Sequence, residues 1–477
     1  MVSSDAQAGD LCAFPAHELA ALIRSRHVSA REVVLAHLER LNEANPLVNA
    51  IVTRIDDRAL QRAEELDRRI VHHGPVGPLH GLPVAHKDGL PVAGVRTTFG
   101  SLLYENHVPT VSALVVERQH TAGAITIGKT NMPEFGIGTH TANAVFGITR
   151  NPYAPNLTSG GSSGGAAAAL ACGMVALADG TDQGGSLRNP ASFCNVVGLR
   201  PTPGRVPMVP TRSAWFDLPV VGPMARTVDD IALMLSAVAG PDPRDPFALP
   251  EGADRFAVSL DRDFARVAVA FGRDLGGLPF EDSVLVSFSS TRAVFEAIGC
   301  DVTDDELDFT GAEEVFRTLR AWGLAGYADD IRRGGDLVSE SVRAVVEHGR
   351  RITAEQIARA YALRTRLAWR AAAFFERYEF LVVPVCQTTP QAADVPWVRC
   401  IGGVEIPDQV AGMLSTALPA TLRVPVVAVP CGFDDAGLPF GVQIMGRPGD
   451  DLGVLQLAKA VETACGAHRR KPVLKGS

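Results

Sequence analysis

The first part of the chain carries hydrophobic positions at helical spacing. Ser29 and Glu32 have the spacing of a capping box, in which each side chain accepts a hydrogen bond from the backbone N–H of the other residue. The apolar residues that follow recur every three or four positions, as on one face of a helix, at Val33, Val34, Leu38 and Leu41. A second helix is predicted over residues 58–70. We therefore expect an N-terminal helical region over residues 1–75.

After residue 80 the pattern changes to short runs of β-branched residues separated by glycine and proline. Such runs are typical of strands that are buried on both faces of a sheet. Helical patterns recur between them, and this alternation indicates an α/β fold, with a large mixed β-sheet and helices on both faces. The predicted strands are residues 82–85, 124–127, 381–385 and 424–429, and the predicted helices are residues 227–238, 339–349, 354–378 and 452–465.

Residues 240–254 form the most linker-like stretch of the chain, because proline, glycine and acidic residues are concentrated there. The strand pattern resumes near residue 380, so the chain is expected to return to the same sheet. We expect a single domain over residues 1–477. Its parts are the helical region already described, glycine-rich motifs over residues 80–235, a variable and largely helical subregion over residues 241–379, and a C-terminal return to the sheet over residues 380–477.

Composition narrows the class of protein. The chain has 477 residues, of which 46 % are hydrophobic and 21 % charged, and this excludes a disordered or collagen-like polymer. The formal net charge is −8 and no basic run is present, so neither nucleic acid nor a membrane is expected as a partner. The expected partner is a small molecule.

The cysteines and the N-terminus predict a cytoplasmic protein. The eight cysteines include no C-x-x-C pair and no Cys/His cluster at zinc-ligand spacing, as expected for free thiols in a reducing compartment without a metal site. The first ten residues lack the basic and apolar regions of a secretory signal. The longest run of small apolar residues, 166–178, is shorter than the roughly 20 residues that span a bilayer.

One glycine-containing motif suggests a nucleotide-binding site. Residues 123–130, GAITIGKT, match the pattern of a phosphate-binding loop. The middle of the motif favours a strand, however, whereas a phosphate-binding loop needs a turn followed by a helix. We therefore expect a strand that ends in a glycine turn with Lys129 at the surface, and nucleotide binding is the alternative.

Two further glycine-rich motifs suggest a catalytic site. Residues 158–173, TSGGSSGGAAAALACG, have the composition of a linker, but the alanines favour a narrow helix that packs closely and holds the loop rigid. Residues 179–190, DGTDQGGSLRNP, place two glycines before Ser186. Consecutive glycines allow backbone N–H groups to converge on one point, as in an oxyanion hole, so Ser186 is a candidate nucleophile.

A nucleophilic serine needs a base. None of the 12 histidines lies in a recognisable serine-hydrolase motif. Lys87 follows an apolar run that should bury it at the end of a strand, where loss of solvation favours the neutral amine. A neutral lysine accepts a proton, so Lys87 is the candidate base.

These motifs resemble the amidase signature family, the hydrolases that use a Ser–cisSer–Lys triad. The resemblance covers nearly the whole chain outside about residues 241–379, and it identifies residues 80–235 as the part that holds the catalytic core motifs. The segments that carry it are LPVAHKDG, GKTNMPEFGIG, FGITRNPYAPNLTSGGSSGGAAAALA, DGTDQGGSLRNPASFCNVVGLRPTPGRVP, GPMARTVDDIALML and VPVVAVPCGFDDAGLPFGVQIMGRPGDDLGVLQLA.

The resemblance implies a role for each of these residues. Ser186 is the implied nucleophile, Lys87 the ultimate base, and Ser162 the hydroxyl that bridges them, with a cis peptide bond between Gly161 and Ser162. The implied reaction is acyl transfer through an acyl-enzyme, without a cofactor or a metal. An oxyanion hole is implied from four backbone N–H groups, those of Gln183, Gly184, Gly185 and Ser186.

Residues around the implied triad are expected to support it. Ser163 is expected to bond the loop of the nucleophile, Thr181 to anchor Ser162, and Asp182 and Arg188 to form an ion pair that fixes that loop. The chain departs from the commonest family pattern where His86 replaces an apolar residue, Gln183 a threonine and Ser159 a proline. His86 is expected to point away from Lys87, because side chains alternate along a strand.

The resemblance also sets expectations about the substrate. Family members include hydrolases of small amides, aryl acylamides and carbamates, and the amidase subunit of a tRNA-dependent amidotransferase. The residues expected to line the acyl pocket are Met132, Phe135, Gly136, Ile137 and Phe193, with Trp215 and Phe216 at its entrance. Apolar walls, together with an Arg188 held by Asp182, favour neutral aryl or alkyl amides, and carbamates or esters with the same carbonyl.

The segment Phe216, Asp217 and Leu218 stands where the amidotransferase type is expected to carry a serine-rich stretch. We therefore expect a free-standing hydrolase, a monomer or homodimer, and the amidotransferase type is the alternative. The sequence leaves open which acyl and amine groups are accepted.

Overall fold

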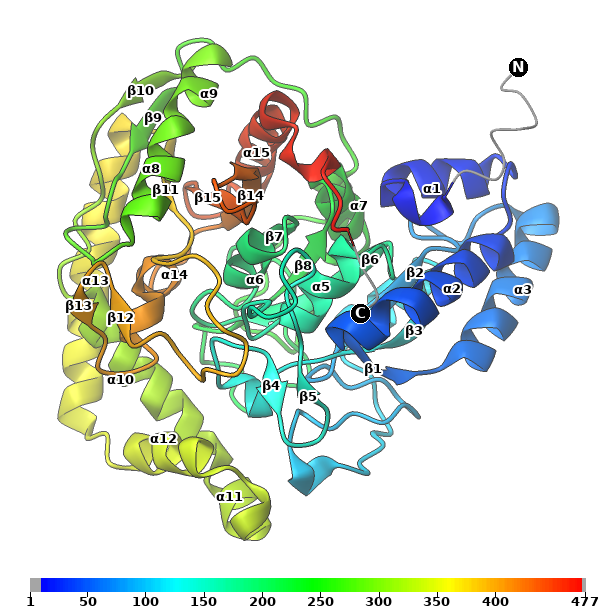
Figure 1. Cartoon of the computed structure of the whole chain (residues 1–477), viewed down its shortest axis with the longest axis horizontal. Coiled ribbons are helices and arrows are strands. Elements are labelled where there is room, and N and C mark those ends of the chain that lie inside the picture. The colour runs from blue at the N-terminus through cyan, green and yellow to red at the C-terminus, as the bar shows by residue number, and fades with distance from the viewer. Residues whose placement is uncertain (1–9, 474–477) are drawn as a thin grey trace.

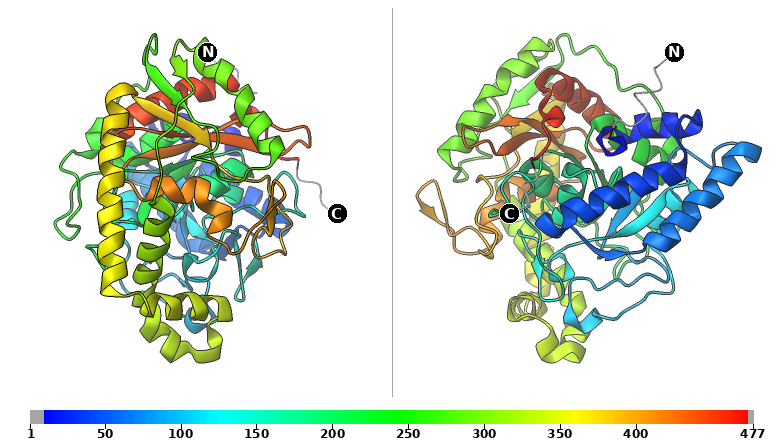
Figure 2. Two further views of the ribbon diagram at one scale, coloured as in Figure 1. Left: turned by 90° about the vertical axis from the view of Figure 1, so that its left-hand side faces the viewer. Right: turned by 45° about the vertical axis from the view of Figure 1, so that its right-hand side comes forward.

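The computed structural model describes residues 10–473. The N-terminal region forms α1 (Ala16–Arg24), α2 (Ala30–Val48), β1 (Ile51–Arg54) and α3 (Asp56–His73), drawn in blue in Figures 1 and 2. The predicted capping box begins α2: the Ser29 hydroxyl accepts from the Glu32 N–H at 3.1 Å, and the Glu32 carboxylate accepts from the Ser29 N–H at 2.7 Å.

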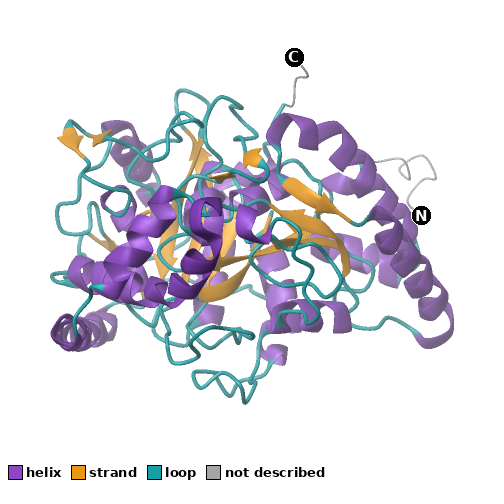
Figure 3. Cartoon of the chain, turned by 90° about the horizontal axis from the view of Figure 1, so that it is seen from below, coloured by secondary structure: helices purple, strands orange, loops and turns teal. Residues whose placement is uncertain are grey.

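A mixed sheet of 11 strands runs through the centre of the molecule in the order β1-β3-β2-β6-β8-β7-β14-β15-β11-β9-β10. Helices lie on both faces of this sheet (Figure 3), so the predicted α/β fold class is confirmed. Neighbouring strands run parallel among β3, β2 and β6 and among β11, β9 and β10, and the other neighbours are antiparallel. The remaining strands are β2 (Pro83–Lys87), β3 (Ile125–Thr130), β6 (Leu177–Asp182), β7 (Val197–Arg200), β8 (Val220–Ala225), β9 (Ala268–Phe271), β10 (Asp301–Thr303), β11 (Phe380–Pro384), β14 (Val426–Phe433) and β15 (Pro439–Met445), with the small pairs β4 (Ala142–Asn143) with β5 (Gly147–Ile148) and β12 (Cys400–Ile401) with β13 (Val404–Glu405).

The strands and helices predicted after residue 80 are present, with ends shifted by a few residues. The later helices are α4 (Leu114–Thr121), α5 (Gly164–Ala171), α6 (Arg188–Phe193), α7 (Val228–Val238), α8 (Asp282–Ser290), α9 (Arg292–Ala297), α10 (Ala312–Leu324), α11 (Ala328–Gly334), α12 (Glu340–Arg350), α13 (Ala354–Arg377), α14 (Leu414–Ala420) and α15 (Asp451–Cys465). Short 3-10 turns connect several of them.

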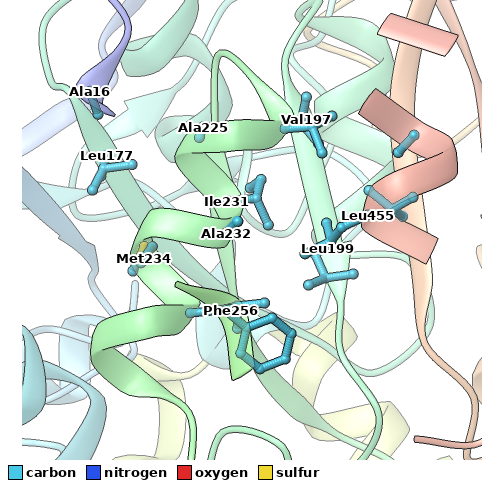
Figure 4. Packing of buried hydrophobic residues seen from close by; sticks show 14 of the residues in the cluster. Ala16, Leu177, Val197, Leu199, Ala225, Ile231, Ala232, Met234, Phe256 and Leu455 are labelled. Atoms are coloured by element: carbon cyan, nitrogen blue, oxygen red, sulfur yellow. The ribbon is translucent and has the colours of Figure 1, made fainter. Parts of the chain in front are cut away.

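The largest hydrophobic cluster lies where α7 packs on the sheet. The helix begins at Thr227, whose hydroxyl accepts from the Asp230 N–H at 3.3 Å. Its apolar side chains meet residues from β7, β8 and α15 (Figure 4), and each buried apolar Å² contributes about 25 cal/mol. This packing joins the middle of the chain to its C-terminal part through Ile231, Ala232, Met234, Val197, Leu199, Ala225 and Leu455.

The subregion over residues 241–379 contains α8 to α13, and the long helix α13 packs against α10. Figure 2 shows α13 in yellow along one side of the molecule, and Figure 1 shows α11 and α12 at its lower end. The same subregion also contributes β9 and β10, which were not predicted and which form one edge of the central sheet. The chain therefore rejoins the sheet earlier than residue 380.

The position of Lys129 corrects a prediction from the sequence. Lys129 belongs to β3 and is fully buried, not at the surface. Its amine donates to the carbonyl of Leu90 and to the Thr97 hydroxyl at 3.0 Å, and burial lowers its pKa to about 8. A Cβ at Gly128 would lie 2.4 Å from the Thr53 carbonyl oxygen, so this glycine serves the close pairing of β1 with β3. The motif that resembles a phosphate-binding loop is an interior strand.

Within residues 10–473, no helix combines the length and the apolar character needed to cross a membrane. The prediction that the N-terminus lacks a secretory signal concerns residues 1–9 above all, which lie outside the described residues. It stays a prediction.

Candidate active site

Three segments meet at the carboxyl ends of two parallel strands inside the sheet, β2 and β6. Lys87 is the last residue of β2, and Ser186 follows the end of the parallel neighbour β6. Ser162 lies in the loop that enters α5, which packs on β2 and β6. A Cβ at Gly165 would lie 2.3 Å from the Asn131 backbone nitrogen, so only glycine lets α5 approach this closely.

The amine of Lys87 is fully buried among hydroxyl groups. Its Nζ lies 2.7 Å from Ser162 Oγ, 2.9 Å from Ser163 Oγ and 2.9 Å from Thr181 Oγ1. The peptide bond between Gly161 and Ser162 is cis, as the resemblance implied. Because a hydroxyl both donates and accepts, this cage satisfies the amine in its protonated and its neutral form.

The surroundings of Lys87 favour the neutral amine. Burial lowers its pKa to about 7, although the carboxylates of Asp182 and Asp179 oppose that shift. An unperturbed lysine titrates near 10.4 and is almost entirely protonated at pH 7. The buried Lys87 is therefore suited to accept a proton near neutral pH.

Asp182 holds the loop that carries Ser186. Its carboxylate accepts from the Gly185 N–H at 2.8 Å and from the Leu187 N–H at 3.1 Å. Arg188 Nε and Nη2 each donate to it at 3.1 Å, which is the expected ion pair. Burial alone would raise the pKa of Asp182, but the charges of Arg188 and Arg200 hold it at about 2.

The hydrogen bond from Gly185 changes the expected oxyanion hole. Its N–H is engaged by Asp182 and does not point freely at a substrate. In the described part of the chain, the N–H groups of Gln183, Gly184 and Ser186 donate to no protein acceptor. Three of the four expected donors are thus available to an oxyanion.

Ser186 and Ser162 are adjacent through their loops. The Ser163 N–H donates to the Ser186 carbonyl at 3.1 Å, so Ser163 bonds the loop of Ser186 as expected. The Ser186 hydroxyl makes no hydrogen bond within residues 10–473, and the residue is 9 % exposed. Thr181 differs from the expectation, because its hydroxyl bonds the Lys87 amine rather than Ser162.

Residues far along the chain complete the wall behind this loop, and the sequence did not reveal them. A Cβ at Gly184 would lie 2.5 Å from Phe316 Cζ in α10 and 2.8 Å from Met413 Cε. The Thr416 hydroxyl in α14 donates to the Gly184 carbonyl at 2.7 Å. No local motif marks these residues, because their role comes from tertiary packing alone.

The predicted pocket segment lies beside Ser162. Met132 and Phe135 are buried, and a Cβ at Gly136 would lie 3.6 Å from both Met132 Cε and Ser162 Oγ. Ile137 packs in the same hydrophobic cluster as Phe135. These residues lie near Ser162, and their role in binding an acyl group stays a prediction.

Three aromatic residues are expected in or near the pocket, Phe193 in its lining and Trp215 and Phe216 at its entrance. Trp215 is 74 % exposed and meets Phe247, with ring centroids 5.9 Å apart. Phe216 packs edge-on against Trp322, and Phe193 is buried in the cluster that includes α5. The role of Trp215 at the pocket entrance stays a prediction.

His86 points away from Lys87, as strand alternation predicts. Its Nδ1 lies 2.5 Å from an oxygen of Asp179, and its Nε2 lies 2.9 Å from Thr126 Oγ1. All of these side chains are buried. The sequence drew no attention to Asp179.

Comparison with known proteins identifies relatives of this chain. A family model described as Amidase matches residues 32–455. A glutamyl-tRNA(Gln) amidotransferase subunit from Geobacillus kaustophilus (strain HTA426) is 34 % identical over 488 residues, covering 96 % of this chain and 98 % of the relative. The protein of the same name from Thermosynechococcus vestitus (strain NIES-2133 / IAM M-273 / BP-1) is 31 % identical over 481 residues, covering 94 % and 97 %.

Solved structures show the same architecture. A bacterial aryl acylamidase of the amidase signature family superposes with a TM-score of 0.90 at 28 % identity, covering 97 % of this chain and 99 % of that one. The 6-aminohexanoate cyclic dimer hydrolase, solved with its substrate, superposes with a TM-score of 0.86 at 26 % identity and the same coverage.

Proposed function

The chain belongs to the amidase signature family, and from this premise we propose that it hydrolyses the C–N bond of linear amides through an acyl-enzyme on Ser186. The observation that carries the proposal is the buried Lys87 amine, 2.7 Å from Ser162 Oγ and beside the Ser186 loop. A neutral amine, a bridging hydroxyl and a second, partly accessible hydroxyl are the parts of a proton relay.

In the proposed mechanism, neutral Lys87 takes the proton of Ser162 as Ser162 takes that of Ser186. The Ser186 hydroxyl turns toward Ser162 for this step, and its oxygen attacks the substrate carbonyl. The negative charge that develops on the carbonyl oxygen is stabilised by the N–H groups of Gln183, Gly184 and Ser186. As the C–N bond breaks, the relay returns the proton to the leaving amine. Water then cleaves the acyl ester through the same relay and regenerates Ser186.

Neutral aryl or alkyl amides are the proposed substrates, with carbamates and esters of the same shape. Met132, Phe135 and Ile137 give the pocket segment an apolar character. Arg188 offers no charge to a substrate, because it binds Asp182 and also donates to Gln443 Oε1 at 2.9 Å. A carboxylate moved into such a pocket loses its hydration without compensation.

The substrate proposal is tested by kcat/KM for a neutral anilide and its carboxylate-bearing analogue. The neutral compound is expected to be preferred. Equal values, or a preference for the anion, would contradict the proposal.

A second candidate is the amidase subunit of a tRNA-dependent amidotransferase, because relatives with that name are 31 % and 34 % identical to this chain. The segment over residues 216–218 argues for a free-standing hydrolase through its sequence, because it lacks the serine-rich stretch expected of the amidotransferase type. Asp217 pairs with Arg364 at 2.7 and 3.0 Å, and Leu218 accepts from Arg200 at 2.9 Å, so the segment is part of the packed interior. Turnover of anilides by the purified chain alone favours the hydrolase, and glutamine hydrolysis that appears only with partner subunits favours the second candidate.

Ser186→Ala tests the proposed nucleophile. We expect turnover to disappear with the fold unchanged, because no other atom can form the acyl-enzyme. Ser192→Ala is the matched control, since Ser192 is also a buried serine and lies in the helix that follows Ser186. Mass spectrometry after mixing with a slowly hydrolysed ester should find the acyl group on Ser186 in wild type and control. Near wild-type turnover by Ser186→Ala would refute the assignment.

A further inference from the structure

A second buried polar network lies on the other side of β2 from Ser162. The carboxylate of Asp179 in β6 accepts from the backbone N–H of Lys87 at 2.9 Å. Its other oxygen lies 2.5 Å from His86 Nδ1 and accepts from Gln119 Nε2 at 2.9 Å. The side chains of Asp179, His86 and Gln119 are completely buried, so all three lost their hydration on folding. A buried carboxylate is retained only where such partners compensate for that loss.

The network ties several elements together around the candidate base. Asp179 connects β6 to β2, and Gln119 adds α4. His86 Nε2 and His120 Nε2 lie 2.9 and 2.6 Å from the hydroxyl of Thr126 in β3. The backbone that carries Lys87 is thus held from three sides.

Asp179 differs electrostatically from Asp182, the other carboxylate close to Lys87. Two buried arginines compensate the charge of Asp182. No arginine or lysine of residues 10–473 forms a salt bridge with Asp179. Burial alone raises the pKa of Asp179, but His86 and its hydrogen bonds outweigh burial and hold that pKa below its ordinary value. Asp179 is therefore an anion near neutral pH, without a permanent cation beside it.

We propose that Asp179 is a positioning residue for the reaction: held by His86 and Gln119, its carboxylate fixes the backbone at Lys87 and sets the pH at which the Lys87 amine becomes a base. This inference rests on the proposed function of Lys87. An anion nearby stabilises the ammonium form, so Asp179 holds the pKa of Lys87 up against the effect of burial. A base whose pKa lies near the working pH is present in its deprotonated form in a useful fraction and still binds a proton strongly enough to remove it from a hydroxyl.

Other groups face Lys87 and stay in place when Asp179 is changed. They are the carboxylate of Asp182, whose charge also acts on the Lys87 amine, and the hydroxyls of Ser162, Ser163 and Thr181. His86 lies beyond Asp179 and contacts Asp179 and Thr126.

Asp179→Asn tests the proposal with little change of shape. The asparagine oxygen can still accept from the Lys87 N–H. Gln119 can turn its amide, since Gln119 Oε1 has no partner within residues 10–473 and can accept from the new NH₂ group. We expect the acidic limb of the kcat/KM profile to move to lower pH by about one unit. This is the pKa shift that a unit charge produces over roughly 10 Å at an effective dielectric constant of about 20. The direction follows because removal of an anion lowers the pKa of the amine.

A matched control separates this effect from a loss of stability. Asp230 is also buried and pairs with a histidine, His17, whose Nδ1 lies 2.7 Å from its carboxylate. Asp230→Asn is expected to leave the acidic limb at its wild-type pH. If Asp179→Asn fails to fold, the double variant of His86→Leu with Asp179→Leu removes the buried pair altogether, a change that proteins often tolerate. Its limb should shift in the same direction.

The rate at which a fluorophosphonate labels Ser186 is measured over the same pH range, because labelling reports the basicity of the relay without amide turnover. The proposal is supported if the acidic limbs of the labelling and turnover profiles both move to lower pH in the Asp179 variants. Both limbs should stay at their wild-type pH in Asp230→Asn. The proposal is overturned if folded Asp179 variants keep both acidic limbs at the wild-type pH, even if their activity is lower by the same factor at every pH. Wild-type protein that neither labels at Ser186 nor hydrolyses any amide overturns the proposed function itself, and this inference with it.

Discussion

Replacement of Gly184 by alanine perturbs the loop of the candidate nucleophile at a defined point. The new methyl group would lie 2.5 Å from Phe316 Cζ and 2.8 Å from Met413 Cε. Carbon atoms in contact are normally about 3.5 to 4.0 Å apart, so the loop or the ring must move by about 1 Å. The Thr416 hydroxyl holds the Gly184 carbonyl, and Asp182 holds the Gly185 N–H, so the loop is restrained on both sides of the new group.

The size of the effect follows from what the loop does. A misplacement of about 1 Å costs on the order of 10²-fold in rate, and loss of one oxyanion donor costs about 10²- to 10³-fold. We therefore expect kcat of Gly184→Ala to fall by about 10²- to 10³-fold. Overpacking should cost about 1 to 3 kcal/mol of stability.

The assay is a double-mutant cycle with Phe316→Ala, which removes the ring that the methyl group meets. kcat and the free energy of unfolding in urea are measured for both single variants, for the double variant and for Gly326→Ala, whose new methyl group would meet only Arg212 Cδ, at 4.0 Å. The double variant should recover part of the kcat lost in Gly184→Ala. If Gly184→Ala keeps wild-type kcat, or if the losses of the two variants simply add, the steric reasoning is wrong.

Other predictions concern the relay and its supports. Lys87→Ala and Ser162→Ala should each lower kcat/KM by about 10²- to 10⁴-fold in a folded protein, and a loss below tenfold would remove the residue from the relay. In wild type, kcat/KM should rise through about pH 7 to an alkaline plateau, because burial lowers the pKa of Lys87 to about 7 and the neutral amine is the active form; EDTA should have no effect, and a maximum in acid would contradict this. Arg188→Met should lower the free energy of unfolding by about 3 to 5 kcal/mol, because Asp182 stays buried with one fewer cation; an unchanged urea midpoint would show that the pair is dispensable.

The sequence predicted local features better than contacts between distant segments. The capping box at Ser29 and the strands around Lys87 follow from patterns of a few residues, and the structure contains them. The sequence predicts Lys129 at the surface, because lysine side chains are rarely fully buried. Its burial depends on Leu90, Thr97 and Asp88, which are brought together only by the fold.

The same limit applies to the site. The glycines before Ser186 indicate a loop that can present N–H groups, but the engagement of Gly185 by Asp182 depends on a side-chain orientation that no motif encodes. Thr416 lies more than 200 residues from that loop, as its bond to Gly184 spans 232 positions. The sequence alone cannot predict this contact, because the two segments come together only in the folded sheet.

The contact of α10 with Gly184 has a consequence for the exchange of parts between relatives. The sequence motifs that carry the family resemblance lie outside residues 241–379, so this region is a natural target for grafting a new specificity. Phe316 in that region nevertheless touches the loop that carries Ser186. A chimera that takes α10 from a relative therefore alters turnover as well as substrate choice, unless the donor helix keeps a side chain of similar shape at position 316.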